Sequence, residues 1–139
     1  MYKRQGFSYL GLDPLSWEPT FRSFDSERVG FDALPTQARH LVAFGALSVR
    51  TLWAAYPDRD PRSAEGVVLI DEVDLHQDAG VALKLPATLR AALPEVQWIL
   101  TTHSPVLASG ASADEVLALR KVTGEGRVEL YAGASAITH

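Results

Sequence analysis

Two stretches decide the fold of this chain, GVVLIDEVDLH at residues 66–76 and ILTTHSP at residues 99–105. In the first stretch, an aliphatic run ends in two adjacent carboxylates, Asp71 and Glu72. In the second, an apolar run ends in Thr-Thr-His103. Aliphatic runs without polar alternation are typical of strands that are covered on both faces. Polar side chains that follow such strands gather at the carboxyl edge of a parallel sheet, where ligands bind.

A helix is expected between these two strands. The apolar runs predict strands at Val67–Asp71 and Val96–Thr101, and the spacing of apolar residues predicts a helix at Asp78–Leu93. Pro86 lies inside this helix and predicts a kink or a late start. Strand, helix and strand in this order form a βαβ unit, which is right-handed in nearly all proteins. The sequence therefore predicts an α/β fold with a largely parallel sheet and flanking helices.

The rest of the chain is expected to complete one domain over residues 1–139. Residues 1–33 mix aromatic residues with Gly, Pro and Ser, which predicts short strands and turns. Apolar residues three and four positions apart predict a helix within residues 34–56. The βαβ core then occupies residues 66–120, and a terminal hairpin and tail occupy residues 121–139.

The composition indicates a globular domain and argues against several classes of protein. Of the 139 residues, 47% are apolar and 22% are charged, which is enough to bury a core. No apolar run is long enough to cross a bilayer, and no signal peptide is recognisable. The absence of cysteine excludes disulfides and thiolate metal sites, and is compatible with a cytoplasmic location. A net charge of −4 argues against a broad nucleic-acid-binding face on this segment.

The two carboxylates and the histidine suit the hydrolysis of a nucleoside triphosphate. Asp71 at a strand end can hold Mg²⁺, which prefers oxygen ligands and keeps several waters. Glu72 can orient and deprotonate an attacking water. His103 can donate a hydrogen bond to a γ-phosphate oxygen. The alternative interpretation is that the acids only end a strand and that the histidine only belongs to a turn.

A second alternative is a metal-dependent hydrolase. Its ligands would come from a cluster of acids and histidines that comprises Asp71, Asp74, His76, Asp78 and His103. Such side chains suit Zn²⁺ or Mn²⁺. The competing explanation is a solvated loop that starts a helix, because acids are favourable near a helix N-terminus.

The two stretches together resemble a known family. GVVLIDEVDLH is similar to the Walker B segment of ABC-type ATPases, and ILTTHSP is similar to their switch-histidine loop, in the branch of the SMC, RecF and OLD-type proteins. The resemblance covers roughly residues 30–120 and implies the C-terminal lobe of a P-loop NTPase fold, with ATP and Mg²⁺ as cofactors. By that likeness Asp71 holds Mg²⁺ through water, Glu72 is the general base, and His103 contacts the γ-phosphate.

The same resemblance implies a contact with ATP across a dimer of ATPase heads. The segment Leu34–Leu41 stands where the family has its signature loop, Leu-Ser-(Ser/Gly)-Gly, so Thr36 and Gln37 would contact the nucleotide of the partner head. Asp74 would begin the loop that crosses the dimer interface. The segment departs from the family pattern because it has no glycine and because Pro35 has no N–H group to donate.

One essential part of such a site is missing from the sequence. A phosphate loop needs Gly-x-x-x-x-Gly-Lys-(Ser/Thr), and none of the three lysines, Lys3, Lys84 and Lys121, stands in such a frame. We therefore expect hydrolysis only where a Walker A-containing lobe or subunit completes the site in cis or in trans. The alternative is a non-hydrolysing interaction module derived from an ATPase. Nucleic acid could be bound through the assembly, but nothing in this segment supports such binding.

Overall fold

The structure is a computed structural model that describes residues 6–133 and 136. The chain divides into two compact units, residues 1–47 and residues 48–139. Whether they act as the single expected domain stays a prediction. The end of the predicted tail within residues 121–139 lies outside the described residues.

The first unit contains a small antiparallel sheet, which confirms the short strands and turns predicted there. Its strands lie in the order β1-β2-β3. Their bounds are Ser8–Leu12 for β1, Pro19–Arg22 for β2 and Arg28–Gly30 for β3, followed by the 3-10 turn η1 at Phe31–Ala33. Phe21 is buried and its ring centroid lies 5.7 Å from that of Tyr9 on the neighbouring strand. Phe21 thus supplies the buried side of the small sheet, whereas Tyr9 is 61% exposed.

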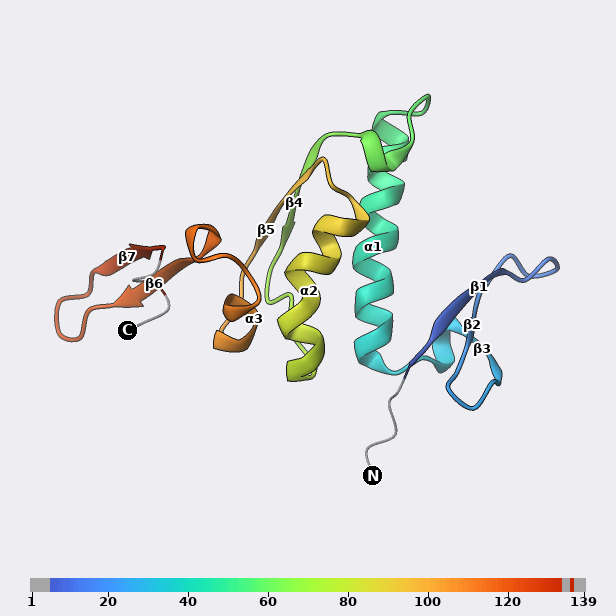
Figure 1. The fold of residues 1–139 in the computed structure, drawn as a ribbon, viewed down its shortest axis with the longest axis horizontal. Coiled ribbons are helices and arrows are strands. Elements are labelled where there is room, and N and C mark those ends of the chain that lie inside the picture. The colour runs from blue at the N-terminus through green and yellow to red at the C-terminus, as the bar shows by residue number, and fades with distance from the viewer. Residues whose placement is uncertain (1–5, 134–135, 137–139) are drawn as a thin grey trace. The chain divides into compact units, whose positions relative to one another are not determined.

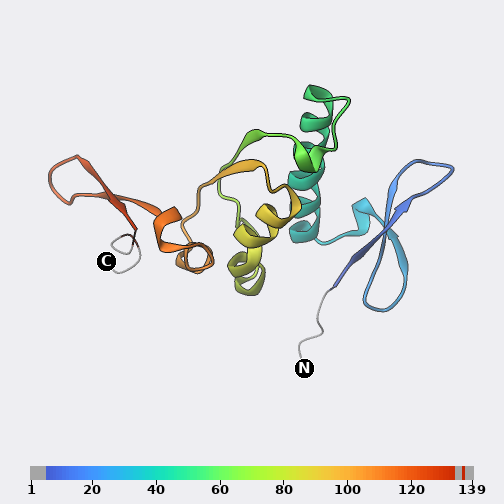
Figure 2. The same cartoon turned by 45° about the horizontal axis from the view of Figure 1, so that its top comes forward.

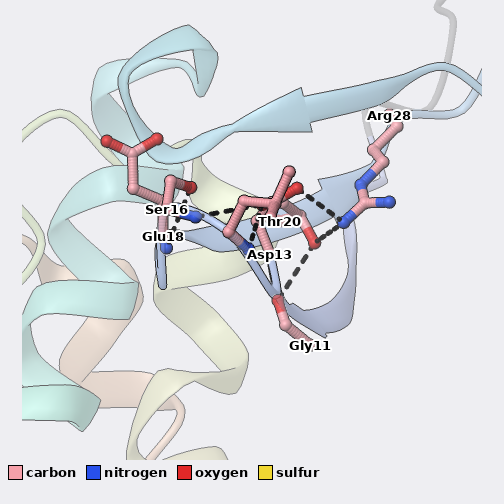
Figure 3. A network of polar contacts seen from close by, with 7 residues as sticks. Gly11, Asp13, Ser16, Glu18, Thr20 and Arg28 are labelled. Atoms are coloured by element: carbon pink, nitrogen blue, oxygen red, sulfur yellow. Dashed lines mark hydrogen bonds and ion pairs between the residues drawn. The ribbon is translucent and has the colours of Figure 1, made fainter.

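The turn between β1 and β2 is built around the carboxylate of Asp13 (Figure 3). The backbone N–H groups of Leu15 and Ser16 donate to Asp13 Oδ1 over 2.9 and 3.2 Å, and Arg28 Nη2 lies 3.4 Å from Oδ2. The N–H of Leu15, followed by that of Ser16, holds the pKa of Asp13 below its ordinary value. Asp13 therefore remains ionised and fixes this turn.

A long helix, α1, spans Thr36–Ala55 and confirms the helix predicted within residues 34–56. The carbonyl of Pro35 accepts a hydrogen bond from the N–H of Arg39 over 3.0 Å, so the helix begins directly after the proline. In the second unit, Leu52 of α1 is buried. None of the helices in the described residues is long and apolar enough to span a bilayer.

The second unit contains the predicted βαβ arrangement (Figures 1 and 2). Its elements are β4 at Gly66–Ile70, α2 at Ala79–Ala92 and β5 at Val96–Leu100. The two strands pair in parallel, with Ile70 opposite Leu100. Asp78 caps α2 by accepting a hydrogen bond from the N–H of Val81 over 2.9 Å. Because α2 continues through Pro86, the late start that the proline allowed is wrong.

The prediction of a largely parallel sheet is wrong for this chain, although the α/β class is confirmed. The described strands form three separate sheets, of which only the pair β4-β5 is parallel. Parallel neighbours need a crossover of a dozen or more residues, whereas short turns join antiparallel strands. The described part of the chain makes a single such crossover, through α2, and short turns join its other paired strands.

One face of the β4-β5 sheet is open, so the expected burial of both strand faces is also wrong. Val68 and Trp98 pack against a core cluster made by Leu52, Ala64, Leu93 and Val96. On the other face, 56% of Val67, 71% of Leu69 and 44% of Ile99 are exposed. Side chains alternate along a strand, so a helical layer on one side leaves the alternate residues uncovered.

The chain continues from β5 into a short helix and then into the expected hairpin, which begins earlier than residue 121. The elements are α3 at Pro105–Ser109, the 3-10 turn η3 at Ala113–Glu115, β6 at Leu117–Lys121 and β7 at Val128–Ala132, with β6 and β7 antiparallel. Two contacts tie this segment to α2. Gly110 approaches the carbonyl of Leu83, and the guanidinium of Arg90 pairs with the carboxylate of Glu115.

Candidate functional site

The candidate site lies at the carboxyl ends of β4 and β5, where ligands of parallel sheets bind. Since Ile70 and Leu100 are paired, the residues that follow them leave the sheet at the same edge. Glu72 comes from the first of these loops and His103 from the second. Their side chains approach each other, with His103 Nε2 lying 3.9 Å from Glu72 Oε1. This distance is too long for a hydrogen bond, so the two side chains do not satisfy each other's hydrogen-bonding groups.

Both side chains are open to solvent. The exposed fraction is 94% for the side chain of His103 and 51% for that of Glu72. Glu72 has a backbone φ of 47°, in the left-handed region that residues with a Cβ rarely adopt. Strained backbone of this kind persists only where the surrounding contacts hold it, and it is frequent at functional sites.

The strand ends are joined by Thr101, which follows β5. Its hydroxyl donates to Asp71 Oδ1 and accepts from the N–H of Glu72 over 2.8 Å. Its backbone N–H donates to the carbonyl of Ile70 over 3.0 Å, and its own carbonyl accepts from the N–H of Val73 over 3.1 Å. The parallel ladder is thereby extended past the last strand residues into the site.

Thr102 makes a second link between the same two loops. Its hydroxyl donates to Asp74 Oδ1 over 2.5 Å and accepts from the N–H of Ser104 over 2.9 Å. The side chain of Asp74 is thus bonded to the loop that carries His103. Neither threonine is predicted from the sequence to be functional. The sequence feature that could have identified them is that two hydroxyl residues follow one apolar run while two acids follow the other.

Two of the residues predicted to bind nucleotide belong to the other compact unit. Thr36 and Gln37 form the first turn of α1, within residues 1–47. The hydroxyl of Thr36 lies 3.4 Å from Nη2 of Arg39. A contact of Thr36 and Gln37 with a nucleotide stays a prediction.

The carboxylate of Asp71 at the strand end suits Mg²⁺ that is shared with a phosphate substrate. It suits less well a metal ion that only protein side chains hold. Asp71 is exposed, and one of its two oxygens remains outside the bond to Thr101. A Mg²⁺ ion is typically held by one or two carboxylates together with substrate phosphates and water. Among residues 6–133 and 136, no three His, Cys, Asp or Glu side chains gather as a metal-binding group. The metal-dependent hydrolase stays a prediction.

Comparison with known sequences finds similarity over part of the chain. No family model matches. The chain is 41% identical over 56 residues to Septu protein PtuA of Bacillus mycoides (strain KBAB4) and 42% identical over 55 residues to that of Bacillus thuringiensis. It is 33% identical over 57 residues to a probable ATPase of retron Vc95 from Vibrio cholerae. These matches include 40%, 40% and 41% of this chain but span only 8%, 14% and 11% of the length of those proteins.

Comparison with solved structures identifies the fold. The chain aligns with an SMC ATPase described for ATP-driven dimerization and DNA-stimulated activation, with a TM-score of 0.59 and 16% identity, over 92% of this chain and 73% of that one. It aligns with the Smc head domain of Pyrococcus furiosus, bound to the C-terminal domain of ScpA, with a TM-score of 0.57 and 17% identity, over 91% and 30%. At such identities the likeness concerns the fold alone. Together with the curated relatives, this likeness confirms the predicted resemblance, and for this chain it shows the α/β fold of SMC ATPase heads.

Proposed function

We propose that this chain is the C-terminal lobe of an ABC-type ATPase and contributes its hydrolytic residues to a composite site. The observation that carries the proposal is the approach of Glu72 and His103 to 3.9 Å at the carboxyl ends of β4 and β5, beside Asp71. The phosphate loop, which this sequence lacks, comes from a Walker A-containing lobe in cis or in trans.

Each of the three residues has a role that follows from its chemistry. Asp71 offers its second carboxylate oxygen to Mg²⁺, while its first is bonded to Thr101. Glu72 orients the attacking water and accepts its proton. His103 donates a hydrogen bond to a γ-phosphate oxygen, where charge is stabilised during transfer. The Mg²⁺ ion, when bound with ATP, neutralises charge on the phosphates.

The open face of the β4-β5 sheet supports the existence of a second lobe. Val67, Leu69 and Ile99 form this face and are substantially exposed. Parallel strands are nearly always covered on both faces, because their apolar side chains point to both sides. A lobe that carries the phosphate loop would cover these residues and bring its nucleotide to the carboxyl ends of the strands. Most of the length of the curated relatives lies outside the matched segments, which leaves room for such a lobe in them.

A dimer of two such heads is the proposed working form. In it Thr36 and Gln37 would reach the nucleotide of the partner head, and Asp74 would lie in the loop at the interface. The alternative is a non-hydrolysing interaction module. Pro35 favours that alternative, because it removes a backbone donor at the helix start that the family uses.

The experiment that tests hydrolysis uses the native assembly, purified through an affinity tag on this chain. We expect Mg²⁺-dependent ATP turnover in the wild type. Loss of a general base costs about 10²–10⁴-fold in rate, so Glu72→Gln should lower kcat by that order while ATP stays bound. The matched control is Glu65→Gln, which makes the same change at the opposite end of β4 and should leave turnover unchanged.

The outcomes separate the two functions. Trapped ATP with lost turnover in Glu72→Gln alone would support the hydrolytic lobe. Equal turnover in Glu72→Gln and wild type would remove Glu72 from the reaction. An assembly that binds this chain but hydrolyses no ATP would refute the proposal in favour of the interaction module.

A further inference from the structure

The hydroxyl of Thr101 occupies the point where the two loops of the candidate site meet. It acts as donor and acceptor at once, to Asp71 Oδ1 and from the N–H of Glu72. A threonine hydroxyl has one hydrogen and two lone pairs, so it can make both bonds at the same time. Valine has the same shape but can make neither.

These bonds fix the backbone around the proposed base. Thr101 accepts from the N–H of Glu72 through its hydroxyl and from the N–H of Val73 through its carbonyl. The left-handed φ of 47° at Glu72 lies between these two anchored amides. A conformation of this kind persists where neighbouring contacts over-determine it. The anchored backbone therefore sets the direction in which the Glu72 side chain leaves the loop after β4, toward His103.

The same hydroxyl also fixes the proposed metal ligand. The bond to Asp71 Oδ1 prevents free rotation of the carboxylate and leaves the other oxygen to face a ligand. Groups that orient a metal-binding carboxylate typically change metal affinity or activity by about 10- to 100-fold when they are removed.

We propose that Thr101 is a positioning residue that holds Asp71 and Glu72 together in the geometry of hydrolysis. This inference rests on the proposed function. Thr101 touches neither water nor phosphate in this scheme and acts only through its two neighbours. It couples the metal ligand to the base, so that loss of one hydroxyl disturbs both.

The test compares variants at one position that differ in the hydroxyl. Thr101→Ser and Thr101→Ala have side chains of similar size, but only serine keeps the hydroxyl, and Thr101→Val keeps the threonine shape without it. The control is Thr88→Val, since the hydroxyl of Thr88 donates to the carbonyl of Lys84 within α2, away from the candidate site. Amide hydrogen exchange at Glu72 is measured on the chain, and ATP turnover is measured on the native assembly.

We expect Thr101→Val and Thr101→Ala to lose the exchange protection of the Glu72 amide and to lower kcat by about 10- to 100-fold. The Mg²⁺ concentration for half-maximal turnover should rise, while KM for ATP should change little. Thr101→Ser should recover both properties, and Thr88→Val should behave as wild type. A role in stability alone would change thermal unfolding without the rise in Mg²⁺ requirement.

The results also distinguish the positioning role from the proposed function. If Glu72→Gln abolishes turnover while Thr101→Ala and Thr101→Val retain wild-type kcat and Mg²⁺ dependence, the positioning role is refuted and the ATPase assignment remains. If Glu72→Gln leaves turnover unchanged, Glu72 takes no part in the reaction, and the proposed function fails at that residue whatever the Thr101 variants do. Should Thr101→Val not fold, the comparison of serine with alanine still decides the outcome.

Discussion

Replacement of Gly110 by alanine should push α3 away from α2, and the size of the effect can be worked out from the structure. A β-carbon at Gly110 would lie 2.0 Å from the carbonyl oxygen of Leu83 and 2.9 Å from its carbonyl carbon. It would also lie 3.2 Å from the carbonyl oxygen of Leu107. The closest of these contacts is about 1 Å inside the van der Waals limit, and it involves backbone, which no rotamer change can relieve.

Overpacking in a core typically costs about 1–3 kcal/mol. Because here two helical segments must separate, we expect Gly110→Ala to lower the free energy of unfolding by about 3 kcal/mol. The assay is urea denaturation of the chain, followed by far-ultraviolet circular dichroism. The control is Gly45→Ala within α1, where a β-carbon meets no atom within 4 Å. That change should stabilise the helix by up to about 1 kcal/mol. A Gly110→Ala variant within about 0.5 kcal/mol of wild type would refute the described approach of α3 to α2.

Two further predictions concern the open sheet face and the η3 turn. Leu69 is 71% exposed, so Leu69→Lys should change the stability of the chain alone by less than about 0.5 kcal/mol. In the native assembly the same change should weaken the association of the lobe proposed to cover this face, and with it ATP turnover. Full turnover in that variant would contradict coverage of this face. The N–H of Ser112, followed by the Arg90 guanidinium, lowers the pKa of Glu115 in the folded chain. The ionised Glu115 therefore stabilises the fold fully above the ordinary glutamate pKa of about 4.3. This stabilisation is lost as the pH falls through the lowered pKa of the folded state. Glu115→Gln should therefore be less stable than wild type at pH 7, and urea midpoints should converge in acid. A difference that is independent of pH would contradict this reasoning.

The βαβ unit was predictable because its signals are local. Two aliphatic runs and an apolar helical spacing specify strand, helix and strand, and the crossover then sets the parallel pairing. The open face of β4-β5 was not predictable from the same residues. Val67 and Leu69 are as apolar as Val68 and Ile70, and an apolar side chain does not reveal whether its covering element belongs to the same chain.

The candidate site was predictable only in its position. The sequence indicates that acids follow one strand and a histidine follows the other, which brings them to one edge of the sheet. The bonds of Thr101 and Thr102 depend on the register that pairs Ile70 with Leu100. A slip of one residue would turn each threonine to the opposite side. Register is a tertiary property, so the two threonines could not be distinguished from ordinary turn residues.

In the proposed composite site, this chain and the other lobe would have different roles, and the contacts within this chain indicate which role each has. Thr101 bonds both Asp71, the proposed metal ligand, and the N–H of Glu72, the proposed base, so the arrangement proposed for hydrolysis exists without a nucleotide. The sequence supplies no phosphate loop, so ATP affinity must come from the other lobe. Changes at Glu72 and Thr101 should therefore act on kcat, whereas changes in the other lobe should act on KM for ATP. A pre-formed hydrolytic half with little affinity for ATP of its own would act only after the second lobe has bound nucleotide and covered the apolar face of β4-β5.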